Sequence, residues 1–69
     1  MKIVYSDHAK KRMMQRGITE LEVINVLQSP HYIKKSFEGR KEALGNVKNK
    51  TITVIYIEIE NYIKIITIR

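Results

Sequence analysis

The sequence predicts an α+β fold in which two N-terminal helices pack on one face of a three- to four-stranded antiparallel β-meander. Apolar residues recur at helical spacing as far as Pro30, and after Pro30 they alternate as they do in strands. No linker, repeat or low-complexity tract interrupts the 69 residues. A single domain covering residues 1–69 is therefore expected.

The first helix is expected over residues 7–16, after a short extended lead-in at residues 2–5. Ser6 or Asp7 can cap its start, because a side-chain oxygen there accepts a hydrogen bond from a free backbone N–H. Gly17 suits the left-handed backbone position that commonly ends a helix. These signals predict both limits of the helix.

The second helix is expected over residues 20–28. Thr19 and Glu22 have the spacing of a capping box, in which each side chain accepts a hydrogen bond from the other residue's backbone. Pro30 then stops the helix, because proline lacks the backbone N–H that a helix interior requires. The two helices should therefore meet at a corner around Gly17.

The remainder of the chain is predicted to be extended, with turns at Glu38-Gly39-Arg40 and Glu60-Asn61. The expected strands are residues 31–37, 41–47, 51–59 and 62–69. The last two are rich in isoleucine and should form a hairpin. This order, helices first and strands afterwards, is the basis for the α+β prediction.

The last hairpin is apolar at both alternating sets of positions. Simple alternation puts Ile52, Val54, Tyr56, Ile66 and Ile68 in one set, and Ile55, Ile57, Ile59, Ile63 and Ile65 in the other. Two short helices can cover only one face of a sheet. The face carrying Ile55, Ile57, Ile63 and Ile65 is therefore expected to meet a second copy of the chain, giving a homodimer, or a partner protein.

The charge pattern favours a polyanionic partner. The net charge is +6 and the sequence pI is about 9.8. Five of the 13 Lys and Arg residues lie within residues 1–16 and six within residues 34–50. RNA or DNA is the first expected partner and an acidic, antitoxin-like protein the second, whereas the alternative is the charged surface of a thermophile-like protein.

Other functional classes are disfavoured by composition. The chain has 0 Cys and 2 His, so no disulfide framework, metal centre or cofactor is expected. It has no apolar run long enough for a membrane span and no signal-peptide pattern at its start, so a cytoplasmic location without membrane association is expected.

His8, Arg12 and Arg16 are spaced four residues apart and should form a polar column on the first helix. A histidine beside two guanidinium groups can hold a phosphate and exchange a proton with it. Each residue also has a structural interpretation. A neutral His8 can hydrogen-bond a neighbour in the first turn, and Arg16 suits the negative end of a helix dipole.

The chain also resembles a known family over nearly its whole length. The residues that carry the resemblance are His8-Ala9, Arg12-Met13, Arg16-Gly17-Ile18, Glu22-Val23, Val26-Leu27 and the closing Ile66-Thr67-Ile68. The chain is similar in these positions to domain-of-unknown-function family 4258. That family has been placed near the RelE-like and BrnT-like toxins, small α+β ribonucleases that cleave RNA without metal.

The resemblance implies a metal-independent, RNA-cleaving site at His8, Arg12 and Arg16, with Thr67 as an additional residue. His8 would act as acid or base, and the two arginines would hold phosphate oxygens. The motif contains no second acid–base group. The candidates are Tyr56, Tyr62, His31 and Arg40.

Further contacts with nucleic acid are expected from basic positions at Lys11, Lys34, Lys35 and Arg40, together with Arg12 and Arg16. The leading hypothesis is therefore an RNA-binding, toxin-like domain that cleaves RNA. The alternative is a non-enzymatic, dimeric interaction module whose basic surface holds an acidic protein or nucleic acid.

Overall fold

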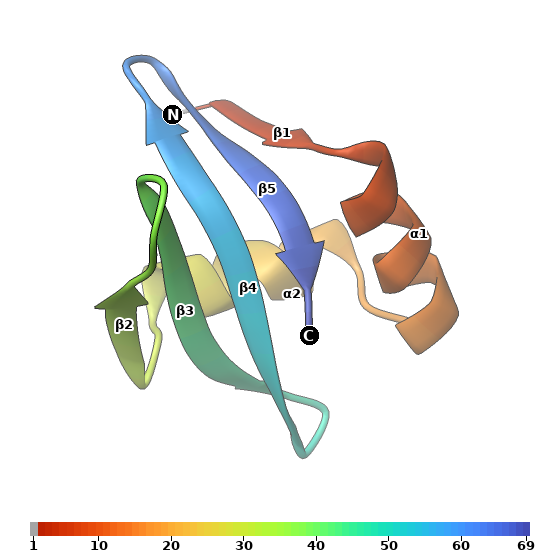
Figure 1. The fold of residues 1–69 in the computed structure, drawn as a ribbon. Coiled ribbons are helices and arrows are strands. Elements are labelled where there is room, and N and C mark those ends of the chain that lie inside the picture. Colours follow the sequence, from red (N-terminus) through yellow and green to blue (C-terminus); the bar gives the residue numbers. More distant parts are fainter. Residues whose placement is uncertain (1) are drawn as a thin grey trace.

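A computed structural model describes residues 2–69 and confirms the α+β prediction. Two helices are followed by the main part of a twisted sheet (Figure 1). Helix α2 lies behind strands β3 and β4 in the view of Figure 1, and α1 lies beside β5. One face of the sheet is therefore covered by helix, and we call the other the open face.

Helix α1 spans Asp7–Arg16 and α2 spans Glu20–Gln28, as predicted. Ser6 is the N-cap of α1, and its hydroxyl oxygen accepts a hydrogen bond from the backbone N–H of Ala9 at 3.0 Å. Gly17 ends the helix with φ 65°. Because that backbone conformation is costly for residues with a Cβ atom, glycine at this position allows the sharp corner between the helices.

The capping box of α2 is also confirmed. The Thr19 hydroxyl accepts from the Glu22 N–H at 3.2 Å, and a Glu22 carboxylate oxygen accepts from the Thr19 N–H at 2.8 Å. These hydrogen bonds lower the pKa of Glu22, chiefly because the Thr19 backbone N–H favours the ionised form. The start of the second helix is thus fixed by residues that are neighbours in sequence.

The sheet has five strands, in the order β1-β5-β4-β3-β2. They are β1 Lys2–Tyr5, β2 Tyr32–Lys35, β3 Arg40–Val47, β4 Lys50–Ile59 and β5 Tyr62–Ile68. The strand β2 is shorter than the predicted residues 31–37. The expected lead-in is a strand in its own right, and it pairs parallel to β5. The sheet is therefore mixed, and it is a meander only from β2 to β5.

A β-bulge in β5 corrects the predicted division of the last hairpin into two faces. Ile55 pairs with Thr67 but the next residue, Tyr56, pairs with Ile65, so Ile66 is the extra residue. The extra residue moves Ile65 to the helix-covered face, where it is 0% exposed. Ile63 also packs against the core. The prediction that Ile55, Ile57, Ile63 and Ile65 share one face is therefore wrong.

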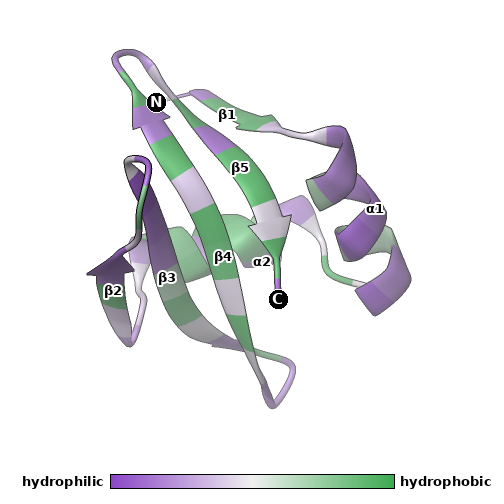
Figure 2. Cartoon of the chain, in the orientation of Figure 1, coloured by the Kyte–Doolittle hydropathy of each residue, from purple (hydrophilic) through white to green (hydrophobic). Residues whose placement is uncertain are grey.

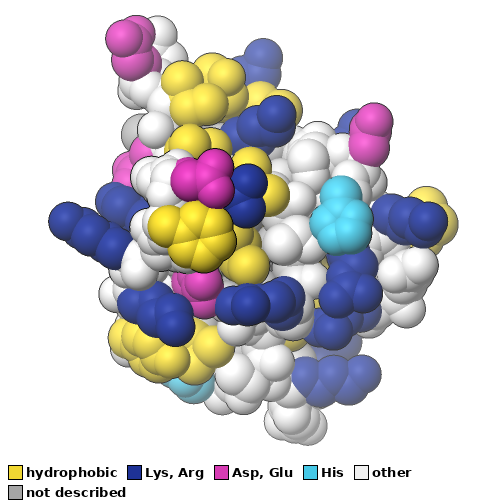
Figure 3. All heavy atoms as spheres, viewed as in Figure 1, with side chains coloured by type: hydrophobic (Ala, Val, Ile, Leu, Met, Phe, Trp, Pro, Cys, Tyr) yellow, Lys and Arg dark blue, Asp and Glu magenta, His cyan; other side chains and the backbone are white. Residues whose placement is uncertain are grey.

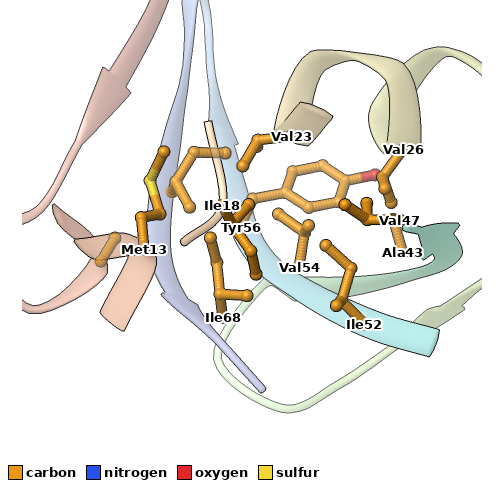
Figure 4. Packing of buried hydrophobic residues seen from close by; sticks show 12 residues of the cluster. Met13, Ile18, Val23, Val26, Ala43, Val47, Ile52, Val54, Tyr56 and Ile68 are labelled. Atoms are coloured by element: carbon orange, nitrogen blue, oxygen red, sulfur yellow. The ribbon is translucent and has the colours of Figure 1, made fainter. Parts of the chain in front are cut away.

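The core lies between the helices and the covered face of the sheet (Figure 4). Ala9 and Met13 contribute from α1, and Val23 and Val26 from α2. Strands β4 and β5 are largely hydrophobic with interspersed polar positions, whereas α1 is largely hydrophilic (Figure 2). α1 thus contributes a narrow apolar stripe to the core and exposes most of its surface.

On the open face, the apolar stripe runs along β4 through Ile55, Ile57 and Ile59. Ile55 is only 9% exposed although no helix covers it. Its neighbours across the sheet are Glu42 and Thr67, whose side chains flank it. Glu42 also accepts a hydrogen bond from Arg69 at 2.7 Å.

Among the described residues, no helix is long and apolar enough to cross a membrane.

Candidate nucleic-acid interface

Helix α1 covers the free edge of the last residues of β5. The pairing of β1 with β5 ends at Tyr5 and Ile65. The Ser6 backbone N–H then donates to the carbonyl of Ile65 at 3.0 Å, and its hydroxyl donates to the carbonyl of Ile66 at 2.7 Å. One turn and a half further along, Arg12 Nε donates to the carbonyl of Ile68 at 3.4 Å. α1 is therefore tied to β5 near both ends of this segment.

The predicted column of α1 is present, and we call His8, Lys11, Arg12 and Arg16 the basic strip. His8, Lys11 and Arg16 are exposed and Arg12 is half-buried. At 3.6 residues per turn, Lys11 lies about 60° around the helix from His8. No ion pair within residues 2–69 involves any of these four residues.

The strip makes α1 strongly basic. Asp7 is the sole acidic residue of α1. In Figure 3, a histidine and several basic side chains lie on the side where Figure 1 places α1, and other basic side chains lie across the rest of this face. A concentration of positive charge beside a low-dielectric protein body raises the local potential and attracts anions. The geometry of this strip suits an extended polyanion.

Thr67 is half-buried and lies on the segment of β5 that α1 covers. It stands between Ile66 and Ile68, whose carbonyl oxygens accept hydrogen bonds from Ser6 and Arg12. Its pairing with Ile55 places its side chain on the open face. Thr67 is thus the predicted additional residue that the fold brings next to the strip.

Tyr56 is not available to the strip, which corrects the suggestion that it supplies a second acid–base group. The side chain is 5% exposed, and its ring points towards Val26 and Val47 in the core (Figure 4). Burial raises the pKa of the Tyr56 hydroxyl, with Lys41 opposing the shift and Glu58 adding to it. Tyr56 is a core residue.

The other three candidates are also distant from the basic strip. Tyr62 begins β5, five residues before Thr67, or roughly 17 Å along an extended strand. Arg40 begins β3, and His31 precedes β2 at the opposite edge of the sheet. His31 is held there by its backbone N–H, which donates to the carbonyl of Leu44 at 2.7 Å. Of the candidate acid–base residues, His8 is therefore the one that lies on the basic strip.

The predicted contacts Lys34 and Lys35 lie on β2 and Arg40 begins β3, so all three are carried by strands that α1 does not border. Lys34 pairs with Glu42 on the open face, whereas Lys35 pairs with Lys41 and points to the other side of the sheet. Lys34 Nζ lies 4.0 Å from a carboxylate oxygen of Glu42, which it shares with Arg69. Exposed aromatic side chains at Tyr32 and Phe37 accompany these cations. Sequence alone did not show that these residues are carried by strands at the other end of the strand order from α1.

Sequence reasoning missed two lysines that the fold places near Arg16. Lys48 and Lys50 belong to the β3–β4 hairpin, and Lys48 Nζ donates to the carbonyl of Gly17 at 3.1 Å. The turn itself was recognisable, because the expected strands end at residue 47 and resume at residue 51. The position of the β3–β4 turn beside the helix corner depends on how α2 packs on the sheet. It could not be predicted from local sequence.

A small α+β domain with a basic helix along the edge of its last strand is thus the structural class of this protein. The chain belongs to the family described as "Domain of unknown function (DUF4258)", whose sequence model matches residues 5–69. This confirms the family resemblance seen in the sequence. No curated protein and no solved structure matches the chain.

Proposed function

We propose that this protein binds RNA through the basic strip of α1 and that His8 acts on a bound phosphodiester. The observation that carries the proposal is the arrangement of His8, Arg12 and Arg16 on one tethered helix, without acidic partners among residues 2–69. Cations that no carboxylate neutralises can exchange their counterions for RNA phosphates. The net charge of +6 supports the same partner.

The chemistry consistent with these residues is attack of the ribose 2′-hydroxyl on the adjacent phosphorus, with departure of the 5′-oxygen. Arg12 and Arg16 are suited to stabilise the negative charge that develops on the phosphate oxygens. His8 supplies one proton transfer, either from the 2′-hydroxyl or to the leaving oxygen. Because the strip offers one such group, water or the RNA itself must complete the other transfer. Cleavage is therefore expected to be slow.

The binding proposal is tested by the salt dependence of affinity for a fluorescent single-stranded oligoribonucleotide. Replacing Arg12 and Arg16 by alanine should reduce the slope of log affinity against log salt by about 1–2, because each lost phosphate contact removes about 0.7 for a single strand. The control is Lys10→Ala, which removes an exposed charge about 200° around the helix from His8. An unchanged slope in the double variant would refute phosphate contact by the strip.

Because Arg12 also tethers α1, the melting temperature of each variant must be measured alongside affinity. Arg12→Lys retains the positive charge but has no Nε–H and cannot hold phosphate oxygens in the same bidentate way. It should keep most of the salt slope while weakening affinity. A slope that falls only when the protein unfolds would show that Arg12 is structural alone.

A second candidate function, binding of an acidic protein in an antitoxin-like pair, has support at the opposite edge of the sheet. All four residues of β2 are exposed, and Ile33 lies beside Lys34 and Lys35 on this edge strand. An exposed edge strand can accept an extended segment from another chain. Lys35→Glu should weaken such a partner and leave RNA affinity near that of the wild type, which separates the two functions.

If the protein binds and cleaves RNA as proposed, it should act as a toxin in the cell. Induced expression in a bacterium should slow growth, and His8→Ala should restore it if RNA cleavage is responsible. Restoration by Lys35→Glu but not by His8→Ala would favour the acidic-partner function.

A further inference from the structure

A hollow of about 310 Å³ lies where the two helices meet the β3–β4 hairpin. In Figure 1 the tip of the β3–β4 hairpin is at the lower end of the molecule and the helix corner lies on the right, at the end of α1. The apolar part of the wall comes from Ile18, Val47 and Ile52, all of which belong to the core cluster. The volume is at the lower end of the range of roughly 300–1,000 Å³ for small-ligand sites. The hollow has room for a group about as large as one nucleotide.

The hollow is held in shape by Lys48. Lys48 and Asn49 are the two central residues of the hairpin, with φ values of 51° and 66°. This left-handed pair makes the tight turn that suits the twist of two antiparallel strands. Lys48 Nζ donates to the carbonyl of Gly17 at 3.1 Å and lies 3.7 Å from a carboxylate oxygen of Glu22. The hairpin is therefore fastened to the helix corner.

Two further cations border the hollow without such partners. Arg16 approaches from the end of α1, and Lys50 approaches from the first residue of β4. Both are exposed, and neither forms an ion pair among residues 2–69. No Asp or Glu lines the hollow. Two unpaired cations around a concave surface raise its positive potential, and a bound anion relieves their mutual repulsion.

We propose that this hollow binds a phosphate, with part of its attached sugar and base, from the RNA strand that lies on the basic strip. The inference rests on the proposed RNA binding and extends it to a second subsite. Arg16 connects the two, because it belongs to the strip and also borders the hollow. From His8 to Arg16 the helix rises about 12 Å. The strand follows α1 towards its C-terminal end and reaches the hairpin.

The apolar wall favours a nucleotide over a free inorganic anion. A phosphate held by Arg16 and Lys50 places its sugar or base against Ile18 and Ile52, where apolar contact adds to the charge interaction. An isolated phosphate ion gains the charge interaction alone. The subsite should therefore be measurable as a dependence of affinity on oligonucleotide length.

The test measures binding of single-stranded uridine oligonucleotides of increasing length to the wild type and to Lys50→Ala. Short oligonucleotides that occupy only the strip should bind both proteins equally. Once the strand is long enough to reach the hairpin, Lys50→Ala should bind about five- to tenfold more weakly, and its salt slope should fall by about 0.7. Lys50→Arg should restore both quantities, whereas the control Lys10→Ala should change affinity less than about twofold.

The outcomes separate this inference from the proposal beneath it. Absence of RNA binding by the wild type refutes both. If the Arg12 and Arg16 double variant binds more weakly but Lys50→Ala keeps wild-type affinity at every oligonucleotide length, the second subsite is refuted. RNA binding by the basic strip is then still supported. Equal weakening of short and long oligonucleotides by Lys50→Ala would place Lys50 at the first site and also refute the two-site arrangement.

Discussion

Gly45 of β3 lies against Val26 of α2, and a substitution there tests how tightly the helix is packed on the sheet. A Cβ atom built at Gly45 would lie 3.0 Å from Val26 Cγ1 and 3.1 Å from Val26 Cγ2. The three heavy atoms nearest to it all belong to Val26. Contacts this short force the neighbour to move, and Val26 is only 2% exposed in the core. A side chain at position 45 therefore requires Val26 to shift by a few tenths of an ångström.

The magnitude follows from two opposing effects. Overpacking a core costs about 1–3 kcal/mol, and replacing glycine by alanine recovers about 0.4–1 kcal/mol by restricting the unfolded chain. Gly45→Ala should therefore lower the free energy of unfolding by about 1–2 kcal/mol. In a domain of this size that loss corresponds to a fall in melting temperature of roughly 4–8 °C for each kcal/mol.

Val26→Ala alone should cost about 2–3 kcal/mol, because it deletes two buried methyl groups and leaves a cavity. In the double variant, the new methyl group at position 45 enters the space that Val26 vacates. The cost of Gly45→Ala and Val26→Ala together should then fall below the sum of the single costs. A coupling free energy of about 1–2 kcal/mol is expected.

Urea denaturation of the four proteins measures this coupling, provided that the slope with denaturant is unchanged. Val23→Ala provides the matched control, because Val23 is also a fully buried valine of α2 but is absent from the three nearest contacts of position 45. Its combination with Gly45→Ala should be additive within about 0.5 kcal/mol. Additivity of the Val26 pair, or a stabilising Gly45→Ala, would refute the reasoning.

Three further outcomes are expected. His8→Ala should lower RNA cleavage by about 10²–10⁴-fold with little change in RNA affinity or melting temperature. Cleavage by the wild type should persist in excess EDTA. If the wild type does not cleave RNA, His8 has a structural role instead. The pKa of Glu22 is lowered from 4.5, so its stabilisation is present above pH 4.5 and is lost as pH falls through the folded-state pKa. Glu22→Gln keeps an acceptor for the Thr19 N–H, and its melting temperature should fall less with acid than that of the wild type; equal acid sensitivity would contradict the assignment. If a second copy covers the open face, Ile57→Lys should convert a dimer to a monomer in sedimentation, and a wild type already monomeric at concentrations on the order of tens of micromolar would exclude that dimer.

The helices were predictable from sequence because their limits depend on residues a few positions apart. The Ser6 cap, the left-handed Gly17 and the Thr19–Glu22 capping box each act within one turn of chain. The column of His8, Arg12 and Arg16 followed from helix periodicity for the same reason. The family resemblance drew mainly on residues of these two helices and on the closing Ile66-Thr67-Ile68, and the family model matches residues 5–69.

The two faces of the last hairpin could not be assigned from alternation alone. One extra residue, Ile66, reverses the alternation within β5 and moves Ile65 into the core. The bulge lies where β1 leaves the edge of β5 and α1 replaces it, so its position depends on pairing between the first and last strands. That pairing joins Tyr5 to Ile65, sixty residues apart in sequence.

The sequence by itself therefore determined the helices, the approximate strands and the basic column, because short-range hydrogen bonding and periodicity control them. The tertiary structure alone decided which basic residues share a surface. It placed Lys50 beside Arg16, put Lys34 at the opposite edge and buried Tyr56 beneath α2. These positions depend on strand order and on helix packing, which arise from contacts between segments that are distant in the chain.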